Sequence, residues 1–541
     1  ANETKIYDIT TVSQAANINL VDDLGNPIVD DLGNQLGQNS LAGLDVVTGL
    51  TSGFWIDAQF QTTGGIFLII VNGSDPMMIY DGTAWYPITD KPIIELNYDT
   101  QTTNFTNGAT LTGGTSGAVG TLIRHTDIGT SGTLWIQLTS GTYQNNEIIS
   151  GGGGSAMVDG VATTLYAAIT GVDTSDLDYV WTYKNRLWFI EKGTMDVWYL
   201  PVDQITGVAT LLPMGGIFNL GGTLMFGAGW SLGSGAAGGL SEQNTFFTDE
   251  GEVAIFQGSN PADPTDWQLV GRYRNGKPQG PNAWIRAGGD LIVATDIGFL
   301  ALSKTVSMDY AALAPSSVSY PIETAWNQAI SARSLEEWNC ITWPERQMVV
   351  VGLPTIDTST PAEAFITNSV TGAWADFTGW SITCMEVFNG QLYFGSENGR
   401  VVSAYVSGAD EGRPYTATYI PLFSDLGSPA SIKIPENCRL RNRGPYDIDV
   451  KLSVMVDYII EIPAVPDATA VPAGSQWGVG LWGQAIWGSG TTLKVQQTWQ
   501  SVGGLGYAIA PCMQVTSGAT IPLDTEIIDL QLTYDTGDIF S

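Results

Sequence analysis

The chain offers few side chains for acid–base, nucleophilic or metal chemistry. Its only histidine is His125, which follows Arg124 and precedes an Asp-Ile-Gly turn. A Ser-His-Asp triad or a histidine metal site would need this residue, whose place beside a turn favours a solvated loop side chain. The sequence has no Gly-x-Ser-x-Gly motif, no phosphate-binding loop and no dinucleotide-binding motif leading into a helix. We therefore predict no catalytic, cofactor-binding or metal-binding residues, and we predict that the chain is not an enzyme.

The cysteines and glycine runs lead to the same prediction. Four cysteines lie far apart and form no Cys-x-x-Cys pair: Cys340, Cys384, Cys438 and Cys512. This spacing favours buried reduced thiols over a zinc ribbon or a redox pair. The glycine-rich run 233–239 lacks the Gly-Lys-Ser/Thr ending of a phosphate-binding loop, so we interpret it as a flexible loop.

Paired carboxylates are the one remaining catalytic option, because propellers and barrels can host glycosidases. The candidates are Asp249, Glu250, Glu252, Asp290, Asp296 and Asp376. Most of them fall in hairpin turns, where aspartate is a common turn former. The segment 81–85, Asp-Gly-Thr-Ala-Trp, is faintly similar to the Asp-box of sialidases, but its spacing differs and no arginine cluster accompanies it. Glycoside hydrolysis is therefore the third hypothesis.

Two repeated patterns have both a ligand-binding and a structural interpretation. Residues 21–36 repeat an Asp-Asp-Leu-Gly-Asn motif, and Asp-rich loops can hold Ca²⁺. The spacing does not match an EF-hand loop, which favours a surface hairpin or extended arm.

Trp477, Trp482 and Trp487 recur every five residues. Exposed aromatic rings can stack on sugars, but packing against a neighbouring domain or subunit is the favoured interpretation.

The composition is typical of short strands joined by tight turns. Hydrophobic residues make up 43% of the 541 residues, charged residues only 14%, and 65 residues are glycine.

Asp and Glu number 54 against 21 Lys and Arg, a net charge of −33. Such a chain repels a DNA duplex rather than gripping it, although a repelling wall suits a conduit. The longest apolar run, 66–71, is too short for a membrane helix, and no secretory signal is evident.

Repeated hairpins organise the chain. Six units, each an apolar strand followed by a turn and a returning strand, begin at Gly65, Val180, Thr245, Asp290, Trp338 and Gln391. Their spacing predicts an all-β fold built on a β-propeller of roughly six blades, with tandem β-sandwiches as the alternative. The Thr-, Gly- and Ser-rich stretch 97–172 predicts a small inserted β-barrel, and changed turn patterns after about residue 410 predict a separate C-terminal β-domain.

The predicted domains are therefore four. They comprise an N-terminal arm with the first blade (1–96), the inserted barrel (97–172), the rest of the propeller (173–409) and the C-terminal β-domain (410–541).

The order of these parts resembles the tail nozzle or hub proteins of short-tailed bacteriophages, also called tail tubular or packaged-DNA stabilisation proteins. The residues that carry the resemblance are WTYKNRLWF (181–189), GGIFNLGG (215–222), FFTDEGEVAIFQG (246–258), DPTDW (263–267), GRY (271–273), 423–433, Asp457-Tyr458 and the three tryptophans of 477–487. Segments 115–118 and 141–147 are similar to a small β-module of phage structural proteins. The resemblance covers most of the chain and is thinnest before residue 50.

The resemblance implies a structural virion protein. It would form a homohexameric ring in the short tail, below an adaptor or head-completion protein and near tail fibres or tailspikes. The ring would retain packaged double-stranded DNA and conduct it during ejection, without sequence-specific binding. The family implies no cofactor and no membrane insertion, with assembly in the cytoplasm of the host bacterium. The alternative function is a carbohydrate-binding or receptor-binding tail propeller.

Overall fold

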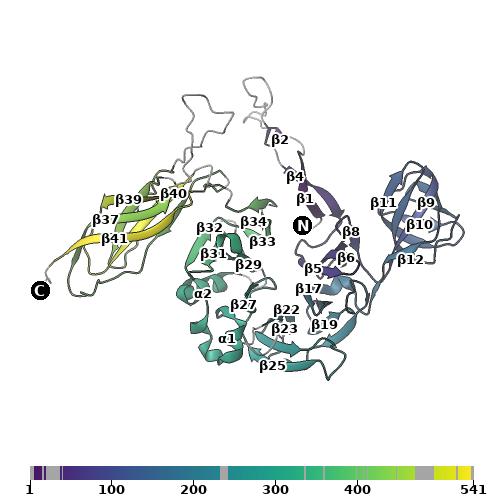
Figure 1. The fold of residues 1–541 in the computed structure, drawn as a ribbon, viewed down its shortest axis with the longest axis horizontal. Helices are drawn as coiled ribbons and strands as arrows, with labels where there is room; N and C mark the ends of the chain where they lie inside the picture. The colour runs from purple at the N-terminus through teal and green to yellow at the C-terminus, as the bar shows by residue number, and fades with distance from the viewer. Residues whose placement is uncertain are drawn as a thin grey trace, which may run out of the picture. The chain divides into compact units, whose positions relative to one another are not determined.

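The computed structural model is almost entirely β-structure (Figure 1). It describes residues 5–14, 18–19, 37–38, 41–231, 242–333, 337–357, 360–397, 399–405, 407–410, 412–445, 447–469, 493–518 and 522–537. The chain divides into two compact units, residues 1–402 and 403–541. Three predicted features lie outside the described residues: the Asp repeat 21–36, the glycine run 233–239 and the tryptophans of 477–487. The all-β prediction is confirmed.

The first unit contains six successive antiparallel sheets, which we number 1 to 6 in chain order. Sheet 1 holds β5 (Ile56–Thr62), β6 (Gly65–Val71), β7 (Met78–Tyr80) and β8 (Trp85–Pro87). Sheet 2 holds β17 (Leu177–Tyr183), β18 (Arg186–Glu191), β19 (Asp196–Tyr199) and β21 (Thr210–Pro213). Sheet 3 holds β22 (Leu224–Trp230), β23 (Gln243–Thr248), β24 (Glu252–Gln257) and β25 (Gln268–Arg274).

The remaining three sheets continue the same pattern. Sheet 4 holds β26 (Trp284–Ala287), β27 (Asp290–Thr295) and β28 (Gly298–Ala301). Sheet 5 holds β29 (Asn339–Trp343), β30 (Met348–Gly352), β31 (Glu363–Asn368) and β32 (Trp374–Thr378). Sheet 6 holds β33 (Ile382–Phe388), β34 (Gln391–Ser396) and β35 (Val401–Ser403). Neighbouring sheets contact one another through first strands, for example β5 with β17, β17 with β22, and β29 with β33. This is the blade arrangement of a β-propeller.

The tight turns between strands depend on glycine at specific positions. Gly251 joins β23 to β24 with φ +83°, a conformation that side chains other than glycine rarely adopt. A Cβ atom there would also lie 2.6 Å from the backbone of Gly276. The hairpin of sheet 3 therefore needs glycine for both its conformation and its close approach to the next segment.

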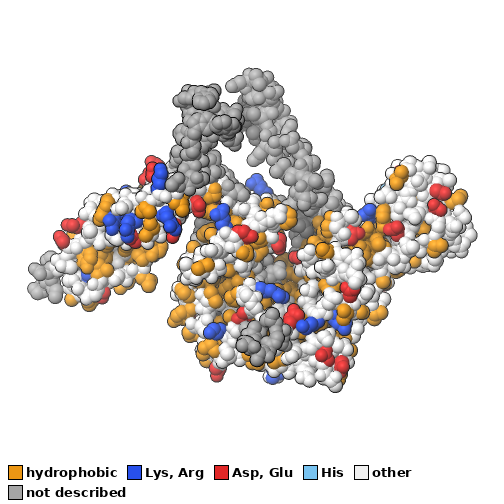
Figure 2. All heavy atoms as spheres, viewed as in Figure 1, with side chains coloured by type: hydrophobic (Ala, Val, Ile, Leu, Met, Phe, Trp, Pro, Cys, Tyr) orange, Lys and Arg blue, Asp and Glu red, His pale blue; other side chains and the backbone are white. Residues whose placement is uncertain are grey.

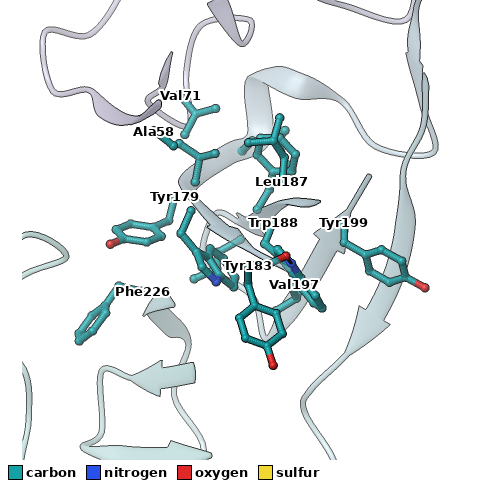
Figure 3. Packing of buried hydrophobic residues seen from close by; sticks show 14 of the residues in the cluster. Ala58, Val71, Tyr179, Tyr183, Leu187, Trp188, Val197, Tyr199 and Phe226 are labelled. Carbon is teal, nitrogen blue, oxygen red and sulfur yellow. Dashed lines mark hydrogen bonds between the residues drawn. The ribbon is translucent and has the colours of Figure 1, made fainter. Parts of the chain in front are cut away.

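Aromatic side chains fill the space between sheets 1, 2 and 3 (Figure 3). Trp188 on β18 is fully buried at the centre of this cluster. Its ring stacks on Trp267 at 5.4 Å and on Trp181 at 5.9 Å between centroids, and it tilts against Tyr199 at 5.2 Å. Strands β18 and β24 bury residues on both faces because a sheet lies on either side of them.

A closed barrel is inserted in the chain between sheets 1 and 2. Its six strands are β9 (Ile93–Thr103), β10 (Thr110–Gly113), β11 (Val119–Ile128), β12 (Ser131–Ser140), β13 (Ile148–Gly151) and β14 (Gly154–Val158), with β15 (Thr163–Tyr166) added on β9. Pairing of β9 with both β12 and β14 closes the barrel. Leu111, Leu122, Leu134 and Ile149 fill its own core. The predicted inserted β-barrel is therefore confirmed as a fold element.

The smaller elements of the first unit surround the sheets. The two α-helices in the described residues, α1 (Leu302–Ser307) and α2 (Glu323–Ala332), lie between sheets 4 and 5 in the chain, and α2 buries Trp326 against both of them. The short helical turns are η1 (Thr174–Asp176), η2 (Tyr310–Ala312), η3 (Ala314–Ser316), η4 (Tyr320–Ile322) and η5 (Pro344–Arg346). The short strand pairs are β1 (Lys5–Gln14) with β4 (Leu41–Thr48), β2 (Ile18–Asn19) with β3 (Gly37–Gln38), and β16 (Ile169–Thr170) with β20 (Gly207–Val208). In the described segments, no helix has the length and apolarity needed to cross a lipid bilayer.

The second unit packs two three-stranded sheets face to face. One sheet has the order β36 (Tyr415–Tyr419), β40 (Ile509–Ser517), β38 (Val450–Val456), and the other has the order β39 (Lys494–Ser501), β37 (Lys433–Gly444), β41 (Glu526–Thr536). Cys438 and Leu440 from the second sheet meet Leu452 and Met513 from the first in a shared core. The predicted C-terminal β-domain is confirmed.

Candidate ligand site where the first strands meet

A pocket lies where the first strands of sheets 1 to 4 converge. Its volume is about 190 Å³, and its walls come from β5, β17, β22 and β26. The side chains that matter for chemistry are Asp57, Gln59, Tyr179, Thr182, Trp284 and Arg286. Sheets 1, 2 and 4 thus supply these six side chains, while sheet 3 lines the pocket with Gly227 and Ala228.

Aromatic side chains make one wall of this pocket rigid. The Nε1 of Trp284 donates hydrogen bonds to the hydroxyl of Tyr179 at 3.2 Å and to the carbonyl of Pro281 at 3.1 Å. The Trp284 ring also stacks on Phe226, with centroids 6.0 Å apart and planes 10° apart. Burial raises the pKa of Tyr179, so its phenol stays protonated and available as a donor.

A glycine keeps the pocket open on the β22 side. A Cβ atom on Gly227 would lie 2.5 Å from Cζ2 of Trp181, which is too close for any larger residue. Trp181 is fixed in turn by a 2.9 Å hydrogen bond from its Nε1 to Oδ1 of buried Asn244. Replacing Gly227 would therefore displace the Trp181 ring and change the pocket wall.

The charge of Asp57 on sheet 1 acts on Glu386 of sheet 6. Asp57 pairs with Ile70 and lies on the face of sheet 1 opposite to the one that packs on sheet 2. Glu386 pairs with Tyr393 on the face of sheet 6 opposite to buried Leu392. Water reaches Asp57 from one side, but burial by the surrounding strands raises its pKa. Burial and then the charge of Asp57 raise the pKa of Glu386.

The described residues show no strand shared between sheets 6 and 1. Each of the six sheets comes from one continuous stretch of chain, so in the described residues no strand near the N-terminus pairs within sheet 6. Among the described residues, backbone hydrogen bonds therefore do not link the two ends of the series. Two like charges repel when both are ionised.

Asp57→Asn is expected to raise the melting temperature of residues 1–402 by about 1–2 °C at about pH 8 and to leave it unchanged at about pH 4. A carboxyl whose pKa is raised by folding favours the fold below its ordinary pKa, and that stability is lost as the pH rises through the raised value. Calorimetry against pH measures the difference. Asp263→Asn is the matched control, because hydrogen bonds from Thr265 lower the pKa of Asp263 and should give no rise. An equal shift for Asp57→Asn at both pH values would contradict this account.

The structure does not bring the predicted carboxylate candidates together as a catalytic pair. Asp249 and Glu252 accept backbone hydrogen bonds at 2.7 Å, Asp249 from Thr223 and Glu252 from both Asn219 and Leu220. Glu250 forms an ion pair with Lys277 at 2.6 Å.

Two of the other three candidates also accept local hydrogen bonds. Asp290 accepts hydrogen bonds from Trp230 and Ser303, and Asp296 accepts one from the backbone of Lys277. Burial raises the pKa of Asp376 on β32. Asp81, in the segment similar to an Asp-box, accepts bonds from Thr83 and Ala84 within its own turn.

Two other sequence predictions need correction. His125 was predicted in a solvated loop, but it is half-buried on strand β11, opposite Leu134, with Nδ1 2.9 Å from Oδ1 of Asn107. Extension of β11 past His125 to Ile128 explains the difference.

The four thiols are free, yet only Cys438 and Cys512 are fully buried, and Cys384 is exposed on β33. Among the described residues, no group of three or more His, Cys, Asp or Glu side chains could hold a metal ion.

No protein-family model and no reviewed protein sequence matches the chain. Solved structures with a similar arrangement include a putative 6-phosphogluconolactonase from Bacteroides uniformis, at 12% identity and a TM-score of 0.27, covering 65% of this chain and 94% of that one. An exo-β-1,3-galactanase from Phanerochaete chrysosporium has 8% identity and a TM-score of 0.23, and the match covers 65% of this chain and 94% of that one. A family 43 arabinoxylan arabinofuranohydrolase from Bacillus subtilis has 9% identity and a TM-score of 0.20, and the match covers 66% of this chain and 95% of that one.

These comparisons correct the prediction that the chain is not an enzyme. The similar structures include a putative lactonase and two carbohydrate-active hydrolases, so the absence of familiar motifs does not exclude catalysis from a fold of this kind. Identities of 8–12% with TM-scores below 0.3 assign no particular activity to the chain. The all-β propeller-type fold rests on the chain's own succession of antiparallel sheets.

Proposed function

We propose that the chain is a structural subunit of the tail nozzle or hub ring of a short-tailed bacteriophage. The observation that carries this proposal is the order of parts: a series of propeller-like sheets, a closed barrel inserted after sheet 1, and a separate β-unit at the C-terminal end. The residues that resemble the phage family follow the same order along the chain. In this role the subunit keeps packaged DNA in the capsid and later conducts it into the host.

The charge distribution supports a role beside DNA rather than one that grips it. Residues 1–402 carry 40 Asp and Glu against 14 Lys and Arg. A wall with this excess repels phosphates and prevents a passing duplex from adhering. We propose that part of this acidic surface lines the passage. Further copies of the chain, an adaptor protein and tail fibres or tailspikes would be the protein partners.

Mass photometry of the purified chain tests this function. Particles of about six times the 57.7 kDa subunit mass are expected, with a ring in negative-stain images. A trimer would instead indicate a fibre-like protein. A monomer that binds glycans would indicate a receptor-binding propeller.

The pocket where the first strands meet favours one second candidate, a carbohydrate-binding propeller. Trp284 provides a half-buried ring at a pocket that Asp57 and Arg286 also line, the combination of stacking and hydrogen-bonding groups that suits sugars. Binding on a glycan array that is lost in Trp284→Ala and Asp57→Asn would support this candidate. Hydrolysis of a bound glycan by the wild-type chain, lost in Asp57→Asn, would show that the site is also catalytic.

A further inference from the structure

Arg286 brings a positive charge to the pocket where the first strands meet. Within the described part of the chain, its guanidinium forms no hydrogen bond and no ion pair. Glu242 lies beside Gly229, the same glycine of β22 that Arg286 approaches, but it pairs with Lys184 at 3.3 Å instead. The N–H donors of the Arg286 guanidinium are therefore available to a ligand.

The pairing of β26 fixes the direction of the Arg286 side chain. Trp284 and Arg286 alternate with buried Ile285, so they share one face of the strand. Trp284 stacks on Phe226 of β22, whereas Ile285 packs in the core of sheets 4 and 5. The face that carries Arg286 thus turns toward sheet 3, where a Cβ atom on Gly229 would lie 3.5 Å from its Nη2. A regular strand, rather than a loop, therefore holds this cation at the pocket.

Tyr179 adds a second donor to the same pocket. Its side chain is only 4% exposed, and Figure 3 shows its hydroxyl on the side of the ring that faces away from Trp188. The hydroxyl oxygen accepts from Nε1 of Trp284 at 3.2 Å, and it donates to no acceptor among the described residues. Burial raises the pKa of Tyr179, so the phenol keeps its proton, and the charges of Asp57 and Arg286 act on it in opposite directions. Tyr179 and Arg286 can therefore donate to one ligand.

The size of the pocket limits what it can hold. Its volume of about 190 Å³ is below the roughly 300 Å³ at which pockets for drug-sized ligands begin. A single sugar unit, or a molecule of similar size, is therefore the largest ligand that the pocket encloses.

A carboxylate is the ligand group that suits these donors best. A guanidinium binds a carboxylate through two parallel hydrogen bonds, which a neutral hydroxyl group cannot accept. Burial raises the pKa of Asp57, and this weakens the repulsion between its carboxyl group and an anionic ligand. The oxygens of Asp57, together with Gln59 and Thr182, remain for the hydroxyl groups of the ligand.

The wider surroundings of the pocket do not attract anions by themselves. The chain has a net charge of −33, and on the described surface visible in Figure 2 the blue and red side chains of residues 1–402 lie scattered rather than in one broad basic patch. Salt screens exposed charges beyond about 8 Å, so distant acidic residues weaken the binding of an anion less than a contacting arginine strengthens it. Selection of an anionic ligand would therefore depend on Arg286.

We infer that the pocket binds a single acidic sugar unit, such as a hexuronic acid, and that Arg286 holds its carboxylate. The inference rests on the carbohydrate-binding candidate proposed above and names the class of sugar for that site. Tyr179 donates to the same ligand, and Asp57 accepts from its hydroxyl groups. A pocket of the same shape without Arg286 would hold the neutral hexose equally well.

The test compares three hexuronates, glucuronate, galacturonate and mannuronate, with glucose, galactose and mannose, which carry a CH₂OH group in place of the carboxylate. Ligand-observed NMR titration measures the dissociation constants for wild type, Arg286→Gln and the control Arg274→Gln. Arg274 is an exposed arginine on β25, the last strand of sheet 3, and lies over the ring of Tyr310. We expect wild type and Arg274→Gln to bind at least one hexuronate at least about tenfold more tightly than its hexose, and Arg286→Gln to bind both alike.

Two further measurements separate charge recognition from loss of structure. Raising the salt from about 50 mM to about 500 mM should weaken hexuronate binding and leave hexose binding unchanged. Arg286→Gln should melt within about 2 °C of wild type by circular dichroism, because it removes no ion pair seen among the described residues. Arg286→Lys keeps the charge but not the planar fork, so its affinity for the hexuronate should fall between those of wild type and Arg286→Gln.

The outcomes distinguish this inference from the function on which it rests. Equal binding of hexuronates and hexoses by wild type, unchanged in Arg286→Gln, would overturn the inference and leave the carbohydrate-binding candidate intact. Binding of none of the six sugars by wild type would contradict both.

Discussion

Trp188→Ala is expected to lower the free energy of unfolding of residues 1–402 by about 4 kcal/mol. The side chain is fully buried, and its ring contacts Trp181 on β17, Tyr199 on β19 and Trp267 just before β25. Alanine would leave a cavity and remove several aromatic pairs at once. The hydrogen bond from Nε1 to the carbonyl of Tyr183, 3.2 Å long, would also be lost.

Differential scanning calorimetry of the full chain measures this effect. The transition of residues 1–402 should move to lower temperature, while the transition of residues 403–541 should stay in place, because the two units are separate compact bodies. Tyr320→Ala is the control, since this aromatic side chain is 51% exposed and should change stability by no more than about 0.5 kcal/mol. A loss below about 1 kcal/mol for Trp188→Ala would contradict its central place in the core.

Lys433→Met is expected to destabilise residues 403–541 by about 3 kcal/mol. Lys433 is fully buried at the start of β37, and its Nζ donates to the carbonyls of Ser431 at 2.9 Å and Tyr507 at 2.8 Å, and also to that of Ser428. Methionine preserves most of the volume but donates no hydrogen bond. Loss of the ammonium group leaves three backbone carbonyl acceptors around this position without their shared donor.

Urea denaturation, with circular dichroism recording each transition, measures the loss. Lys451→Met is the matched control, because this exposed lysine lies on β38 of the same unit. Equal unfolding midpoints for the two methionine variants would show that the Lys433 ammonium stabilises nothing. Unfolding of residues 1–402 should be unaffected by either change.

The sequence allowed the fold class to be predicted because hairpins are local. An apolar strand such as 65–71, a glycine turn and a returning strand lie within a few residues, so the pattern is visible without knowledge of distant contacts. The barrel was also predictable, since its strands are consecutive from β9 to β14. Helices α1 and α2 were not, because the repeated strand pattern simply stops between sheets 4 and 5.

The candidate site could not be predicted from the sequence. Asp57, Tyr179 and Arg286 belong to three different sheets, and only the folded chain brings them to one pocket. Within its own strand, Asp57 is an ordinary polar residue alternating with buried Ile56 and Ala58. The acidic residues that did attract attention, such as Asp249, were turn and capping residues whose oxygens accept local backbone hydrogen bonds. No local pattern distinguishes the two kinds of carboxylate.

Cryo-electron microscopy of the assembled wild-type chain tests the central proposal most directly. The proposal predicts a closed ring of about six copies around a passage wide enough for duplex DNA, with acidic side chains of residues 1–402 on part of its wall. A monomeric or trimeric particle with glycan density in the pocket beside Trp284 would contradict it. A ring whose passage is lined by Lys and Arg would contradict the proposed electrostatic role of the acidic surface.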